Sequence, residues 1–85
     1  MRMKNIFIDN LPTLDLHGED GDSAVVLVKY FISDSIILNN KKIVIVHGKG
    51  TGILRKRVRE YLAKDKRVKK YYQDNFNDGM TVVEI

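Results

Sequence analysis

The sequence predicts a two-layer α/β sandwich in which two helices pack on a four-stranded mixed sheet. Four short segments carry the apolar patterns of strands, and two longer segments repeat apolar residues at helical spacing, in the order β-α-β-α-β-β. A helix between two strands makes those strands parallel, whereas a short polar turn before the last strand makes it antiparallel to its predecessor. We place the domain at residues 13–85, after a lead-in of residues 1–12 in which residues 5–8 are a candidate additional strand.

The first strand of the domain ends at a glycine and carries an acid and an imidazole. Period two puts Leu14 and Leu16 on one face, with Asp15 and His17 together on the other. On one face, the carboxylate can orient the ring and raise the basicity of its distal nitrogen. Asp15 and His17 are therefore the candidate catalytic residues.

The first helix is predicted to begin at a cap supplied by Asp20 or Asp22 and to continue to about Leu38, where Asn39 and Asn40 end it. Its buried stripe consists of Ala24, Leu27, Val28, Phe31, Ile32, Ser35 and Leu38. Four more apolar residues broaden the stripe, and they either cover a sheet edge or meet a second copy: Val25, Val26, Ile36 and Ile37.

The centre of the chain combines a buried strand, a glycine loop and a basic helix. Residues 43–46 are all β-branched, which is typical of a strand buried on both faces. The helix after the glycines buries Ile53, Leu54, Val58, Tyr61 and Leu62. Glycine lets a backbone approach a ligand closely, and the N–H groups of a first helical turn attract anions. The sequence therefore predicts a phosphate site, with His47, Lys49 and Arg55 around it.

The remaining strands are predicted at residues 67–73 and 80–85, separated by a polar turn. In the first of them Val68 is a core residue, and Tyr71 and Tyr72 lie on opposite faces.

Composition and charge narrow the class of partner. The chain has no cysteine, which excludes disulfides and cysteine-ligated metals, and nothing in it resembles a signal peptide or a spanning helix, so we expect a soluble cytoplasmic protein. Residues 41–70 hold twelve of the fifteen Lys and Arg but only two of the eleven acids, which favours a polyanion such as nucleic acid. The glycine spacing fits neither a dinucleotide fingerprint nor a P-loop, so no nucleotide cofactor is expected.

The chemistry that fits best is phosphodiester cleavage. His17 and His47 both end strands of the parallel part, where open α/β sheets bind ligands, so they are expected to meet. Acid–base capacity from His17 and Asp15, with positive charge from Lys49 and Arg55, is what the reaction needs. On RNA the 2′-hydroxyl can be the nucleophile, and then no metal is required.

Three alternatives stay open at this point. Asp15, His17 and His47 are also a conceivable metal triad of two histidines and a carboxylate. The domain can bind nucleic acid without cutting it, or it can dock a partner on the apolar outer face of its first helix.

The motifs, taken together, resemble the Smr (small MutS-related) domain family. The resemblance rests on Asp15-Leu16-His17-Gly18, on His47-Gly48-Lys49-Gly50-Thr51-Gly52 followed by Leu54-Arg55, and on the closing strand Gly79-Met80-Thr81-Val82-Val83-Glu84-Ile85. It implies an α/β sandwich with nicking or endonuclease activity on DNA or RNA, in proteins that stand alone or end a MutS homologue linked to recombination suppression and ribosome rescue.

The resemblance also implies residue roles. Cleavage falls on Asp15 and His17. Nucleic-acid binding falls on the glycine loop, and together with the basic helix this gives the candidate binding residues His47, Gly48, Lys49, Gly50, Thr51, Gly52, Arg55 and Arg59.

Two departures from the family pattern concern activity. After Asp-Leu-His-Gly, where members usually have an apolar residue and then Ser or Thr, this chain has Glu19, Asp20 and Asp22. Each of these carboxylates is expected to repel a phosphate by roughly 1 kcal/mol at ~4 Å in bulk water. The turn over 74–79 is also shorter and poorer in glycine than is common in the family.

Overall fold

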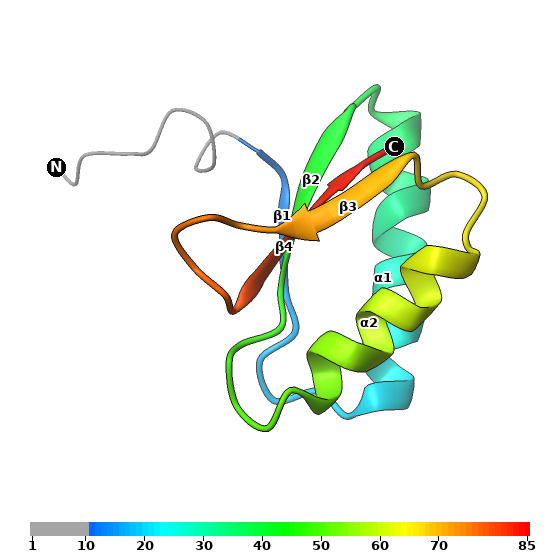
Figure 1. Ribbon diagram of the computed structural model, residues 1–85. Helices are drawn as coiled ribbons and strands as arrows, with labels where there is room; N and C mark the ends of the chain where they lie inside the picture. Colours follow the sequence, from blue (N-terminus) through cyan, green and yellow to red (C-terminus); the bar gives the residue numbers. More distant parts are fainter. Residues whose placement is uncertain (1–10) are drawn as a thin grey trace, which may run out of the picture.

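The computed structural model describes residues 11–85 and confirms the two-layer α/β sandwich. Both helices lie on the same face of the sheet (Figure 1). The candidate strand at residues 5–8 lies outside the described residues. The elements are β1 (Thr13–Asp15), α1 (Gly21–Ile37), β2 (Lys42–Val46), α2 (Ile53–Lys64), β3 (Lys70–Gln73) and β4 (Met80–Glu84).

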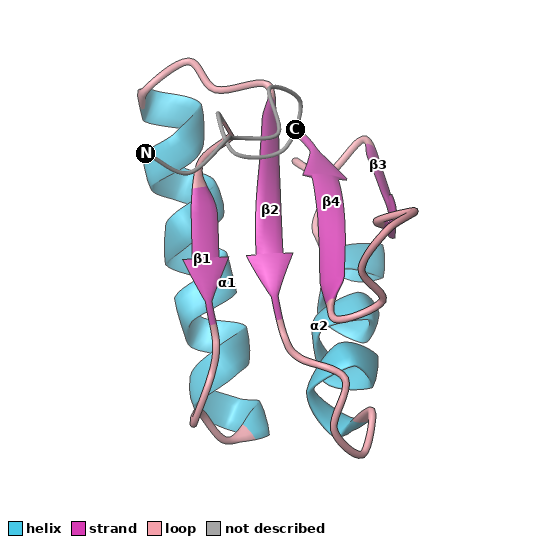
Figure 2. Ribbon diagram, turned by 90° about the vertical axis from the view of Figure 1, so that its left-hand side faces the viewer, coloured by secondary structure: helices cyan, strands magenta, loops and turns pink. Residues whose placement is uncertain are grey.

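The strand order in the sheet is β1-β2-β4-β3, so the last strand is inserted between β2 and β3. β1 and β2 are parallel, whereas β4 is antiparallel to both of its neighbours. In the parallel pair Asp15 is the register partner of Val46. The carboxyl ends of β1 and β2 therefore meet at one edge of the sheet, with the loops that follow them side by side (Figure 2).

The core fills the space between the sheet and the helices. Ile43 and Ile45 of β2 point into it and are fully buried, and Val44, on the other face of the strand, is fully buried as well. The prediction of a strand buried on both faces is thus confirmed. The main cluster contains Leu16, Ala24, Val28, Ile32, Ile43, Ile45, Val58, Leu62, Val83 and Ile85.

Helix α1 begins as predicted but ends slightly earlier. Asp20 is its N-cap and accepts a hydrogen bond from the Ser23 N–H at 2.8 Å. Leu38 is the C-cap and is 70% exposed, because the chain turns away from the core at Asn39, which has a left-handed φ of 65°. The prediction of Leu38 as a core residue is therefore wrong. Val26 and Ile37 are also exposed, so they do not cover the sheet edge.

Helix α2 buries Val58 and Leu62, and Leu54 and Tyr61 pack against the core as predicted. Ile53 is 63% exposed, contrary to the prediction. It opens the helix at the end that projects beyond the strands (Figure 2), where no sheet lies beneath it.

The strand predicted over residues 67–73 is shorter, because β3 begins only at Lys70. Val68 and Tyr71 pack against the core, and the Tyr72 side chain, on the other face, donates to Glu84 at 3.1 Å. The assignment of the two tyrosines to opposite faces is confirmed.

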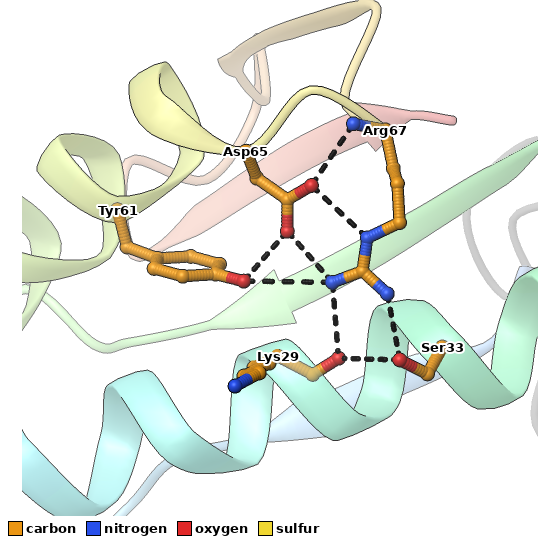
Figure 3. A network of polar contacts seen from close by, with 5 residues as sticks. All are labelled: Lys29, Ser33, Tyr61, Asp65 and Arg67. Atoms are coloured by element: carbon orange, nitrogen blue, oxygen red, sulfur yellow. Dashed lines mark hydrogen bonds and ion pairs between the residues drawn. The ribbon is translucent and has the colours of Figure 1, made fainter.

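Arg67 belongs instead to a polar network that joins the end of α2 to α1 (Figure 3). Its guanidinium donates to both carboxylate oxygens of Asp65, at 3.0 and 2.7 Å, and to Ser33 Oγ at 2.6 Å. Tyr61 donates to the same carboxylate at 2.6 Å. These bonds hold the pKa of Asp65 well below its usual range, chiefly through the side-chain hydrogen bond from Arg67.

Candidate functional site

The loop after β2 forms an open pocket at the carboxyl edge of the sheet. The pocket has a volume of about 390 Å³ and is lined by Glu19, Asp20, Gly21, His47, Gly48, Lys49, Gly50, Thr51, Gly52, Ile53, Leu54 and Arg55. Seven of the eight candidate binding residues thus come together. The exception is Arg59, which lines a neighbouring groove of α2.

Glycine is required in this loop by its backbone conformation. Gly48 and Gly52 have φ values of 78° and 83°, in the left-handed region that other residues rarely adopt. A Cβ atom placed on Gly48 would meet no protein atom within 4 Å. The space over Gly48 is therefore open, and a ligand can approach the backbone closely there.

The N-terminus of α2 offers hydrogen-bond donors to the pocket. Its N-cap is Gly52, which has no side chain to accept from the first turn. The N–H of Ile53 reaches Thr51 Oγ1 at 3.4 Å, and the first helical bond runs from Lys56 N–H to Gly52 O. The amides of Leu54 and Arg55 lie in the first turn and have no partner within the helix. Together with the helix dipole they favour an anion at this end.

The β3–β4 turn holds the loop in place from the other side. The N–H groups of His47 and Gly48 both donate to Gly79 O at 3.0 Å. A Cβ atom on Gly79 would lie 3.2 Å from the Gly48 backbone, so this close approach favours glycine. Lys49 and Asp78 form an ion pair at 3.3 Å, which is exposed and hence weak.

His47 is among the residues that line the pocket, but its ring nitrogens are engaged by protein partners. The residue is only 6% exposed, and both ring nitrogens have protein partners. Nδ1 lies 2.9 Å from Gly48 O, and because a carbonyl oxygen only accepts, Nδ1 carries the proton. In the neutral ring Nε2 then accepts from the hydroxyl of Thr81 at 2.8 Å. His47 thus supports the loop from beneath.

The environment of His47 favours its neutral form. Burial lowers the pKa of the imidazole below its usual value of 6.5, and the nearby Arg59 and Arg55 lower it further. Folding therefore disfavours protonation of the His47 ring. The stability that the neutral ring contributes is complete above pH 6.5, and it is lost as the pH falls toward the pKa of the folded state. We expect an NMR titration of the ring to show a midpoint below 6.5, and a midpoint at or above 6.5 would contradict the buried, neutral assignment.

The arginines of α2 differ in position. Arg55 lies at the pocket, since a Cβ atom on Gly52 would be 3.5 Å from its Nη2. Arg57 instead pairs with Asp22 of α1 at 2.8 Å. Arg59 has two buried nitrogen atoms, Nε and Nη2, that find no hydrogen-bond partner within residues 11–85.

Asp15 and His17 are exposed at the end of β1, and their contact differs from the one predicted. Asp15 Oδ1 accepts from the backbone N–H of His17 at 2.9 Å. Among residues 11–85 the His17 ring has no hydrogen-bond partner, so the carboxylate fixes the turn and not the imidazole.

His17 and His47 were expected to lie close together, but only the backbones of the two strand ends are adjacent. The Leu16 N–H bonds to Val46 O at 2.8 Å, which places the ends of β1 and β2 next to each other. Because Asp15 is the partner of Val46, it is Leu16 and not His17 that lies beside His47 in register. Neither Asp15 nor His17 lines the glycine-loop pocket.

Two of the three acidic residues near the site have specific partners. Asp20 caps α1, and the hydrogen bond from Ser23 lowers its pKa below the usual 3.8. The Asp22 carboxylate is paired with Arg57. Of the carboxylates of Glu19, Asp20 and Asp22, only that of Glu19 has no partner in the described part of the chain. Within residues 11–85 no three His, Asp or Glu side chains gather closely enough to hold a metal ion, so the triad of Asp15, His17 and His47 is not assembled.

The fold and the site define a two-layer α/β domain with a glycine-loop pocket at the carboxyl ends of two parallel strands. The Smr domain family model matches residues 14–85, and the chain belongs to this family.

The chain is similar to parts of larger proteins. It is 47% identical over 66 residues to the endonuclease MutS2 of Finegoldia magna and 42% identical over 72 residues to that of a Geobacillus strain. These alignments cover 78% and 85% of this chain but only 8% and 9% of the relatives, so the chain spans less than a tenth of their length.

Two solved structures share the fold. The crystal structure of the Smr domain of Thermus thermophilus MutS2 superposes with a TM-score of 0.85 at 32% identity, covering 87% of this chain and 96% of that one. The second is the crystal structure of YdaL, a stand-alone small MutS-related protein from Escherichia coli, with a TM-score of 0.81 at 22% identity. The match covers 86% of this chain and 63% of that one, and at this identity it shows only that the fold is shared. None of the helices within residues 11–85 is both long and apolar enough to span a bilayer.

Proposed function

We propose that this domain is a nucleic-acid endonuclease of Smr type that cleaves phosphodiester bonds in RNA or DNA. The observation that supports this most strongly is the glycine-loop pocket, in which an open backbone, first-turn amides without a partner in the helix, and Arg55 converge. These groups suit a phosphate, since amides and a guanidinium donate to its oxygens and stabilise the charge of a transition state. The relatives in Finegoldia magna and Geobacillus are endonucleases by name.

In this proposal the glycine loop after β2 binds the strand, and the end of β1 supplies the catalytic group. The glycine loop, Lys49 and Arg55 bind the sugar–phosphate backbone, and the adjacent end of β1 presents His17 to a phosphodiester of the same strand. His17 takes a proton from the nucleophile, which is the 2′-hydroxyl in RNA or a water molecule in DNA. As the oxygen of the nucleophile bonds to phosphorus, the bond from phosphorus to the leaving oxygen breaks, and the leaving oxygen takes a proton from the protonated His17 or from water. Asp15 is a positioning residue, because it holds the backbone of the turn that carries His17.

A second candidate is a nucleic-acid-binding module without catalysis. It is favoured by one specific observation, that the Asp15 carboxylate bonds the backbone of His17 and leaves the ring unoriented among the described residues. A ribosomal partner, a role in ribosome rescue or repair, a cytoplasmic location and metal-free cleavage all stay predictions.

Binding is tested with an Arg55→Gln substitution. We expect it to weaken binding to labelled single-stranded RNA and DNA in fluorescence anisotropy. Because one phosphate contact is lost, the slope of log K against log salt should become shallower by about 0.7 to 1. Lys29→Gln, which removes one positive charge from the exposed side of α1, is the matched control and should change the slope little. Equal affinities and slopes for wild type and Arg55→Gln would rule out the pocket as the phosphate site.

A further inference from the structure

Phe76 is an aromatic residue whose side chain is exposed to solvent. It is 90% exposed, the largest exposed fraction among the large apolar residues of the described chain. Single exposed apolar residues are common on protein surfaces, so exposure alone assigns no role. The role of Phe76 is inferred from the position of its turn and from the hydrogen bonds that hold the turn.

The turn that carries Phe76 is fixed by side-chain hydrogen bonds. The N–H of Phe76 donates to Asp74 Oδ2 at 3.1 Å, and Asp74 is itself buried. The N–H of Gly79 donates to Asn77 Oδ1 at 2.8 Å. The backbone of the turn is therefore held, so the ring projects from a fixed point, which reduces the ordering entropy that a contact with a ligand would otherwise cost.

The same turn is attached to the glycine loop. Gly79 O accepts from two loop amides, and Asp78 pairs with Lys49 of the loop. Phe76 is two residues from Asp78, and two residues of extended chain span at most about 7 Å. The turn that carries Phe76 therefore lies against the loop, so a strand bound along the loop can pass the ring.

We propose that Phe76 is a stacking platform for a base of the strand whose backbone binds at the glycine loop. This inference rests on the proposed function and adds a substrate class to it. Bases of a duplex are already stacked and paired, whereas an unpaired base offers a free face to an aromatic ring. The preferred substrate is accordingly a single strand, or a junction with splayed bases.

The test compares Phe76→Ala and Phe76→Trp with wild type in fluorescence anisotropy. The ligands are a single-stranded oligonucleotide and an abasic strand of equal length. We expect Phe76→Ala to lose about tenfold in affinity for the strand with bases and little for the abasic strand, and Phe76→Trp to retain binding. Ile37→Ala is the matched control, since Ile37 is 80% exposed at the far end of α1.

The outcomes separate the two proposals. If Phe76→Ala binds the strand with bases as tightly as wild type does, or loses the abasic strand equally, the stacking role is overturned while phosphate binding stands. If wild type binds neither strand, the proposed function is wrong and the stacking role fails with it. Unchanged thermal unfolding of Phe76→Ala is expected, because the side chain is exposed.

Discussion

Replacing His17 with alanine is expected to lower the rate of phosphodiester cleavage by about 10²- to 10⁴-fold, the usual contribution of a general acid or base. The chain has two histidines, and the ring of His47 is buried with both nitrogens engaged. His17 is thus the exposed imidazole, and imidazole is the side chain that most often transfers protons in enzyme catalysis. Affinity for the strand should change little, because the groups proposed to bind phosphate lie in the glycine-loop pocket.

The measurement is single-turnover cleavage of a labelled strand, with affinity followed by anisotropy. Asp15 provides a graded control. Asp15→Asn keeps an oxygen that can accept from the His17 N–H, whereas Asp15→Ala removes it, so the asparagine variant should retain more activity. A His17→Ala protein that cuts as fast as wild type would remove His17 from the mechanism.

Removing the Asp65 carboxylate is expected to cost about 3 kcal/mol of the free energy of unfolding. Asp65→Ala deletes the bonds from Arg67 and Tyr61 to the carboxylate. It leaves the guanidinium over α1 with its contacts to Ser33, the Lys29 carbonyl and the Tyr61 hydroxyl (Figure 3). Hydrogen bonds to charged groups contribute about 1.5–3 kcal/mol each, and the exposed part of Arg67 reduces the sum. Urea denaturation measures the loss.

The same residue makes stability depend on pH. The pKa of Asp65 lies well below its unfolded value of 3.8, so its contribution is complete at neutral pH and is lost as the pH falls through the pKa of the folded state. Asp65→Asn should therefore flatten the acid limb of the stability curve. The matched control is Glu60→Ala on the exposed side of α2, which should change stability by less than about 0.5 kcal/mol. Equal stabilities of Asp65→Ala and Glu60→Ala would contradict a stabilising network.

Local patterns were sufficient to predict most of the fold. The run of β-branched residues at 43–46 fixed a buried strand, and Asp20 marked the start of α1 because its carboxylate is placed to accept from the first turn. The insertion of β4 between β2 and β3 could not be predicted in this way, since it depends on pairing between segments far apart in the sequence.

The candidate site was predictable to a similar degree. The glycine spacing identified the loop and the helix N-terminus, which are local features. It did not reveal that the His47 ring bonds Thr81, which is 34 residues away, or that Gly79 packs on the loop. The contact of Asp15 was missed because the strand ends at that residue, and the turn brings the His17 N–H to its carboxylate.

The most direct test of the central claim is cleavage of end-labelled single-stranded RNA and matched DNA by the wild-type domain, with and without EDTA. We predict cutting of at least one strand that is lost in His17→Ala, and the chemistry of the product ends identifies the nucleophile. Cutting that persists in EDTA assigns the reaction to acid–base groups of the chain. Tight, salt-sensitive binding with no cutting of either strand, with or without EDTA, would contradict the account and identify a binding module instead.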